Sequence, residues 1–115
     1  MSAHGIIHVA VGVVINQQQE VLISQRHMDS HQGGLWEFPG GKKESQESIE
    51  ATLEREFVEE LGIKPIEFFP FAKILHHYVE KTVLLDVWRI TQYRGEEIGR
   101  EGQAVEWCPI KDLRP

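Results

Sequence analysis

The chain has 115 residues, a formal net charge of −6 and a single cysteine. This length suits one globular domain over residues 1–115 and leaves no room for a second core. The acidity is local to residues 44–60, and the neutral remainder gives no sign of a broad basic surface, so no stable binding of nucleic acid is expected. One cysteine excludes an intrachain disulfide and favours a reducing compartment, for which we predict the cytoplasm.

The first apolar segment, residues 6–15, predicts a core strand. It is too short to span a bilayer and lacks the basic leader of a targeting segment, so no membrane association is expected. The polar residues 16–19 form a turn, and residues 20–26 predict a second strand that returns antiparallel to the first. Residues 27–34 form a loop, which is followed by a short apolar stretch at 35–38.

A helix is predicted over residues 46–61. Apolar side chains recur there at every fourth position, and a glycine follows to end the helix. The recurring residues are Ile49, Leu53, Phe57 and Leu61, and the glycine is Gly62. Strands are predicted at 68–79, 81–93 and 104–110, which together with the helix indicate a mixed sheet in an α/β or α+β domain.

The helix is strongly acidic: seven glutamates lie between Glu44 and Glu60, with Arg55 as the only basic residue. Like charges one helical turn apart repel by roughly 0.2–0.5 kcal/mol per pair. On a helical projection Glu56 and Glu60 border the inward apolar stripe, and Glu59 lies roughly 80° to one side. Converging carboxylates favour a divalent cation, and oxygen ligands favour Mg²⁺ or Mn²⁺. On spacing alone, a solvated acidic face remains the alternative.

The sequence Pro39-Gly40-Gly41-Lys42 comes before the helix. Proline restricts the backbone, and the two glycines allow it to turn sharply and to approach a ligand with its own carbonyl and amide groups. Strand, turn and acidic helix could therefore hold a metal ion from two sides.

These segments resemble a known family. Gly41, five residues, Glu47, seven residues, Arg55-Glu56-Phe57, one residue, Glu59-Glu60, one residue and Gly62-Ile63 reproduce the Nudix box of the Nudix hydrolases. The stretches VAVGVVI, ISQR, LWEFPGGK and REGQAVEW resemble its MutT-type branch, whose members cleave oxidised nucleoside triphosphates. The resemblance implies the Nudix fold, a mixed sheet flanked by helices with a loop-helix-loop catalytic motif.

The resemblance also implies a metal site and a catalytic cluster. The Mg²⁺ ligands would be Glu56, Glu59, Glu60, the Gly40 carbonyl and Glu101. Glu47 and Arg55 would belong to the catalytic cluster, with Arg55 orienting the neighbouring carboxylates. We predict Glu56 as the general base and keep Glu101 as the alternative. By itself, Glu101 would be interpreted as a surface residue, and Arg55 as the surface ion-pair partner of Glu59.

Substrate-binding residues are predicted before and after the helix. Arg26 and Lys42 are candidates for phosphate, and Phe38 and Tyr78 for stacking on the base. His31 lies near Phe38 in sequence. Lys81 is a further candidate, although it departs from the family, whose members carry an arginine near the nucleotide there. For Trp36, packing in the core is the favoured interpretation.

One departure from the family concerns the end of the chain. MutT-type proteins usually continue into a C-terminal helix whose asparagine reads oxidised guanine, whereas this sequence stops at IKDLRP, residues 110–115. A truncated chain, a tail missing from the sequence and a different mode of base recognition are the alternatives.

The predicted function is Mg²⁺-dependent hydrolysis of a nucleoside triphosphate to the monophosphate and pyrophosphate, with 8-oxo-dGTP as the leading substrate. The alternatives are another nucleotide, such as dCTP, CTP or a dinucleoside polyphosphate, and a non-catalytic Nudix-fold module that binds 8-oxo-guanine. The intact glutamate set favours the enzyme. A monomer or weak dimer is expected.

Overall fold

The computed structural model describes residues 5–26, 34–99 and 102–113. Its elements in chain order are β1 (Ile6–Val14), β2 (Glu20–Gln25), β3 (Trp36–Glu37), β4 (Gly40–Lys42), α1 (Ile49–Leu61), β5 (Lys64–His77), β6 (Thr82–Arg94), β7 (Val105–Pro109) and a 3-10 turn, η1 (Ile110–Asp112). Within these described ranges, no helix is long and apolar enough to cross a membrane.

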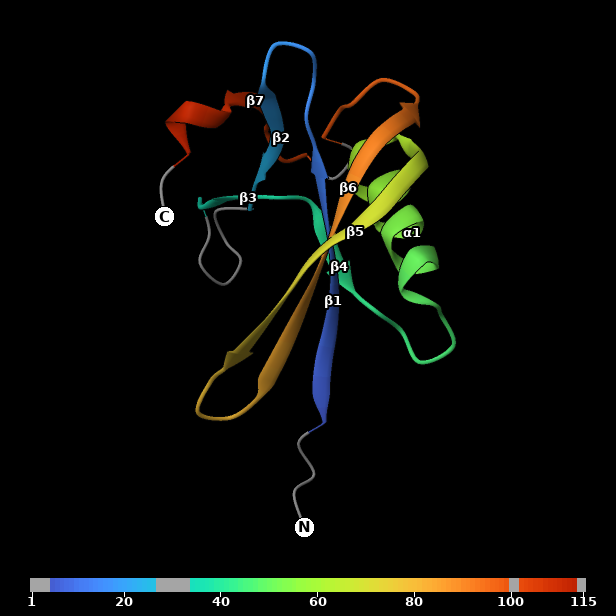
Figure 1. Cartoon of the computed structure of the whole chain (residues 1–115), viewed down its shortest axis with the longest axis vertical. Helices are drawn as coiled ribbons and strands as arrows, with labels where there is room; N and C mark the ends of the chain where they lie inside the picture. Colours follow the sequence, from blue (N-terminus) through green and yellow to red (C-terminus); the bar gives the residue numbers. More distant parts are fainter. Residues whose placement is uncertain (1–4, 27–33, 100–101, 114–115) are drawn as a thin grey trace.

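The strands form two sheets. The larger has the order β4-β1-β6-β5, in which β1 and β6 are parallel and the other neighbours are antiparallel; the smaller has the order β3-β2-β7 and is antiparallel throughout. The α+β fold class predicted from the sequence is confirmed. Figure 1 shows α1 beside the larger sheet, while β1, β5 and β6 extend well past the helix toward the N-terminal end.

The second strand was predicted to return antiparallel to the first, and its direction is as predicted. However, only Ile15 and Val21 form a bridge between the two segments, and β2 pairs instead with β3 and β7. The turn at residues 16–19 therefore carries the chain from one sheet to the other, a change that local alternation of apolar residues cannot reveal.

The helix begins at Ile49, three residues later than the periodicity predicted. The Ser48 side chain accepts a hydrogen bond from the Ala51 amide, and this N-cap places the preceding residues outside the helix. The end was predicted correctly: Gly62 adopts φ 72°, a left-handed conformation that glycine takes without a steric penalty.

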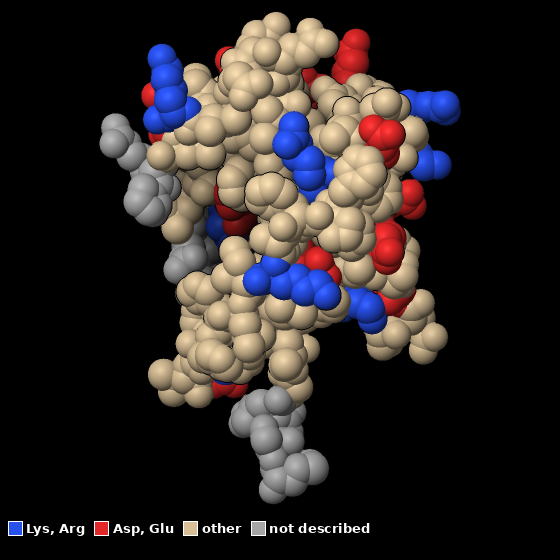
Figure 2. Space-filling view, in the orientation of Figure 1, with Lys and Arg blue, Asp and Glu red and all other residues tan. Residues whose placement is uncertain are grey.

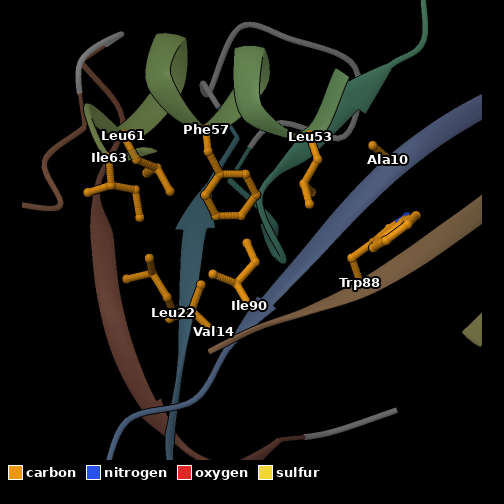
Figure 3. Packing of buried hydrophobic residues seen from close by; sticks show 9 residues of the cluster. All are labelled: Ala10, Val14, Leu22, Leu53, Phe57, Leu61, Ile63, Trp88 and Ile90. Atoms are coloured by element: carbon orange, nitrogen blue, oxygen red, sulfur yellow. The ribbon is translucent and has the colours of Figure 1, made fainter. Parts of the chain in front are cut away.

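The core lies between α1 and the sheets. The buried face of α1 consists of Leu53, Phe57 and Leu61 (Figure 3). These side chains belong to one core cluster with residues of β1, β2 and β6 and with the residue after the helix cap, namely Ala10, Val14, Leu22, Trp88, Ile90 and Ile63. A Cβ at Gly12 would come within 2.3 Å of the Phe57 ring, so glycine lets the helix approach β1 closely. This packing fixes the helix face whose edge carries Glu56 and Glu60.

Candidate active site

Arg55 is the centre of the polar cluster on α1. Its Nε and Nη2 atoms donate to the Glu47 carboxylate, and Nη1 donates to Glu56 Oε2 at 2.8 Å and to Glu59 Oε1 at 3.3 Å. Nη2 also donates to the Lys42 carbonyl at 3.2 Å, which ties the helix to β4. A lysine could not make this set of bonds, because only the planar guanidinium offers several donors in fixed directions.

Glu47 lies in the turn before the helix and is held as an anion. The Arg55 hydrogen bonds chiefly, with help from the Glu44 amide and the Thr52 hydroxyl, lower the pKa of Glu47 from 4.5 to about 2. The same pairing raises the pKa of Arg55 above its ordinary value. The two predicted members of the catalytic cluster are therefore in contact and oppositely charged at neutral pH.

Glu56 and Glu59 lie beside each other, because both accept from Nη1 of Arg55. The Glu56 carboxylate rests on β4: a Cβ added at Gly41 would lie 2.3 to 2.6 Å from its carboxylate atoms. The glycine at position 41 thus makes room for a carboxylate from the helix. Glu59 is exposed and Glu60 is partly buried at the end of α1.

Oxygen atoms suited to a hard cation occur along this face of α1 and on β4. Across residues 5–26, 34–99 and 102–113, however, no three carboxylate, imidazole or thiol groups converge into a formed metal cluster. Arg55 supplies the positive charge that draws Glu47, Glu56 and Glu59 together. The donor set, carboxylates plus the main chain of a glycine-rich strand, still fits Mg²⁺ or Mn²⁺ better than zinc.

A cavity of about 490 Å³ opens on the other side of β4. Its floor is apolar and comes from alternate residues of β1 and β6, namely Ile7, Val9, Val11, Val83 and Leu85. Phe38 forms a wall, and Arg26, Lys42 and Lys81 supply three cations. Four of the predicted substrate-binding residues therefore share one cavity, together with the predicted metal-site residue Gly40.

Two other predicted residues lie elsewhere. Tyr78 is 54% exposed and is not among the residues that line this cavity; its ring lies 5.7 Å from the Lys81 ammonium. The predicted core position of Trp36 is wrong, because its side chain is 40% exposed on the short edge strand β3. His31 and Glu101 fall outside the described residues.

A second hollow, of about 870 Å³, lies on the helix side of β4. Arg55 and Glu56 line it, while Gly41 and Lys42 line both this hollow and the cavity with the apolar floor. Strand β4 is therefore a thin partition between the helix cluster and the three cations. The predicted catalytic residues on α1 and the predicted substrate-binding residues therefore lie on opposite sides of the same short strand.

Sequence reasoning missed several polar contacts around the cluster. Thr52 is fully buried and donates from Oγ1 to Glu47 at 2.9 Å. Asp86 is also buried, with His8 Nε2 at 2.8 Å from its carboxylate, and His8 lines the hollow that Glu56 reaches. An acidic residue inside the apolar run TVLLDVW was the available signal for Asp86, because a buried carboxylate requires a partner.

The segment after β6 is attached to the end of the helix. The Ile98 amide donates to the Leu61 carbonyl at 3.0 Å, and the Gln103 side chain donates to the Glu60 carbonyl at 3.2 Å. Glu97 accepts from Tyr93 and Trp107, and burial together with this carboxylate raises the pKa of Tyr93. These contacts satisfy carbonyls that a helix end leaves without partners.

Acidic side chains are most numerous on one side of the surface (Figure 2). In Figure 2 acidic side chains gather toward the side where α1 lies, and basic side chains occur in separate small groups on the face shown. The local acidity of the helix is therefore retained in the folded molecule.

Comparison with known proteins assigns the chain to a family. Residues 10–115 match the model of the NUDIX domain, and the chain belongs to this family, which confirms the membership predicted from the motif. The 8-oxo-dGTP diphosphatase of Escherichia coli K12 is 36% identical over 107 residues, which cover 93% of this chain and 83% of that protein. The CTP pyrophosphohydrolase of the same strain is 36% identical over 98 residues, covering 85% and 73%.

Solved structures show the same likeness. A structure from a study of MutT of Aliivibrio salmonicida and Vibrio cholerae superposes with a TM-score of 0.81 at 37% identity, covering 94% of this chain and 83% of that one. The solution structure of the Escherichia coli ORF135 protein gives a TM-score of 0.83 at 31% identity, covering 97% and 79%.

Proposed function

We propose that this protein is a divalent-metal-dependent hydrolase that converts a nucleoside triphosphate to the monophosphate and pyrophosphate. The observation that carries the proposal is the position of Glu56, whose carboxylate lies on Gly41 of the partition that separates the helix cluster from the cavity with three cations. A triphosphate held by those cations would have its phosphate chain next to the acidic helix.

Nudix hydrolases are generally dependent on divalent metal ions. In this chain Glu56, Glu59, Glu60, the Gly40 carbonyl and Glu101 would hold Mg²⁺, for which Mn²⁺ is a suitable substitute. When bound, the ion would neutralise phosphate oxygens and lower the pKa of a coordinated water molecule.

Side chains of the protein would bind the phosphates, accept the proton and position the acidic groups. Arg26 and Lys42 bind and orient the phosphate chain, and Glu56 accepts the proton of the water that attacks the β-phosphorus. Arg55 holds Glu56 and Glu47 in place through the hydrogen bonds described above. The leaving oxygen departs with the nucleoside monophosphate, so pyrophosphate is the second product.

Base selection is assigned to the cavity with the apolar floor. A purine would lie against Phe38 and over Val9, Val83 and Leu85, with Lys81 as a donor to a carbonyl of the base. We propose 8-oxo-dGTP as the leading substrate, because the relative of that name shares 36% identity over most of both chains. CTP is the second candidate, because a CTP pyrophosphohydrolase is related at the same identity. We further propose that the protein works in the cytoplasm as a monomer or weak dimer.

The test incubates the protein with Mg²⁺ and a panel that contains 8-oxo-dGTP, dGTP, CTP and dCTP, and follows release of monophosphate and pyrophosphate. Turnover of 8-oxo-dGTP well above that of dGTP is expected. Release of orthophosphate would contradict attack at the β-phosphorus. Binding of 8-oxo-guanine without hydrolysis of any nucleotide would contradict the proposed enzyme and favour a non-catalytic binding module.

A further inference from the structure

The His8 side chain lines the helix-side hollow, the space of about 870 Å³ that Arg55 and Glu56 also line, and a buried carboxylate holds it there. Asp86 is 2% exposed, and its Oδ2 atom lies 2.8 Å from His8 Nε2. The pair adds little net stability, because burying a charged group is costly. It does fix the orientation of the ring, and since Nε2 is engaged, Nδ1 is the nitrogen that a ligand in the hollow could reach.

Two cations of the same lining lack a carboxylate partner. Lys42 and Lys43 lie outside ion-pairing distance of every carboxylate in the described part of the chain, and the Lys43 ammonium donates to the Glu44 carbonyl at 3.3 Å. Of the two carboxylates in the lining, Glu44 is exposed and Glu56 is paired with Arg55. The hollow therefore offers unpaired positive charge in a space that the oriented imidazole shares.

Strand β4 leads from the cavity with the apolar floor to this hollow. Gly40 lines the cavity, and Gly41 and Lys42 line both spaces. Lys43, which follows the strand, lines the hollow but not the cavity. Two residues of a strand span about 7 Å, which is comparable to the separation of the first and third phosphorus atoms of a triphosphate. A phosphate chain that follows β4 from the cavity would therefore pass the Glu56 carboxylate on Gly41 and end beside Lys43.

We propose that His8 and Lys43 form a subsite for the terminal phosphate of a nucleoside triphosphate and for the pyrophosphate product, and that Asp86 positions His8 for this contact. A phosphate oxygen at Nδ1 would place the imidazole between two anions, where an imidazolium donates to both. The Lys43 ammonium would add a second charge-assisted hydrogen bond. This inference rests on the proposed function and adds to it a preference for triphosphates over diphosphates.

The first experiment measures binding without catalysis. Inorganic pyrophosphate is titrated into metal-free protein while the histidine ring resonances are followed by NMR. The His8 resonances are expected to shift and to saturate, whereas His76 and His77, exposed on β5 outside the hollow, should shift little. The affinity should fall in Lys43→Met and stay the same in Lys73→Met, which removes an exposed lysine of β5. No shift at His8, or equal shifts of these three histidines, would overturn the proposal.

The second experiment takes the preferred triphosphate of the panel as substrate and the diphosphate of the same nucleoside as competitor. In Lys43→Met and in His8→Gln, KM for the triphosphate and the inhibition constant of pyrophosphate should rise about two- to fivefold, in proportion to the modest energy of partly exposed ion pairs. The inhibition constants of the diphosphate and the monophosphate should not change. Glutamine retains a donor for Asp86, so the buried carboxylate keeps a partner. Equal effects on triphosphate and diphosphate would overturn the subsite.

Asp86→Asn tests the positioning role, because it keeps the side-chain volume and removes the charge that orients His8. It should weaken pyrophosphate binding about as much as His8→Gln, and the double variant should be no weaker than either single variant. A loss of thermal stability with unchanged pyrophosphate binding would show that Asp86 is merely structural. Saturable binding at His8 in a protein that hydrolyses no nucleotide would instead reject the proposed function and leave the anion site in place.

Discussion

The cluster around Arg55 and the cavity with the apolar floor lie on the two sides of β4 and are built differently. Around Arg55, carboxylates, a buried hydroxyl and main-chain atoms form a dense set of hydrogen bonds before any ligand arrives. In the cavity, Arg26 bonds to Glu37, and Lys42 and Lys81 line an apolar floor. The groups proposed for chemistry are therefore held in place by many contacts within the protein, whereas the cations proposed for binding have few such contacts.

Glu56→Gln should have the largest effect, because it removes the proposed base and keeps the volume of the side chain. We expect kcat to fall roughly 10²–10⁴-fold with little change in KM. Pyrophosphate release measures the rate, and thermal unfolding checks that the fold survives. A rate near that of the wild type would contradict the assignment of Glu56 as the general base.

Gly41→Ala tests the partition itself. A Cβ at this position would overlap the Glu56 carboxylate, so the side chain must move away from β4. A displacement near 1 Å can reduce catalysis about 10²-fold. Gly5→Ala, where nothing lies within 4 Å of the added atom, is the matched control. An active Gly41→Ala protein would show that the Glu56 position seen here is not required.

Arg55→Lys keeps the positive charge and loses the fork of donors. Activity should fall about 10-fold to 100-fold, as found when residues that orient metal ligands are changed. The variant should also bind Mn²⁺ more weakly, which can be followed by electron paramagnetic resonance without substrate. Full activity in the lysine variant would show that only the positive charge of Arg55 is needed, and not its several hydrogen-bond donors.

Lys42→Met addresses the binding side of β4. The loss of one exposed cation should raise KM about two- to fivefold at low salt, in proportion to the modest energy of exposed ion pairs, and leave kcat nearly unchanged. The effect should shrink as ionic strength rises. Lys111→Met, on the exposed η1 turn, provides a control that should not alter KM.

The smallest effect expected concerns acid stability. Because the folded state lowers the pKa of Glu47 from 4.5 to about 2, its contribution to stability is fully present above pH 4.5 and is lost as the pH falls toward 2. Glu47→Gln should therefore be less stable than the wild type at neutral pH and should lose less stability over that interval. Denaturant unfolding at several pH values measures the difference; identical pH profiles for the two proteins would contradict it.

The sequence alone determined the family, the α+β class, the acidic helix and its glycine end, because these depend on spacing along the chain. It also indicated Arg26, Phe38, Lys42 and Lys81 as substrate-binding candidates, and these share one cavity. Their assignment came from family resemblance.

Tertiary structure alone decided the rest. Only the folded chain shows that Trp36 is exposed and that the strands divide into two sheets. The contacts of Thr52 and Asp86, and the position of the Glu56 carboxylate against Gly41, likewise depend on how the chain folds. Periodicity reports which face of an element is apolar, but it does not report which other element covers that face. The contacts between elements are therefore fixed only when the whole chain packs around its core.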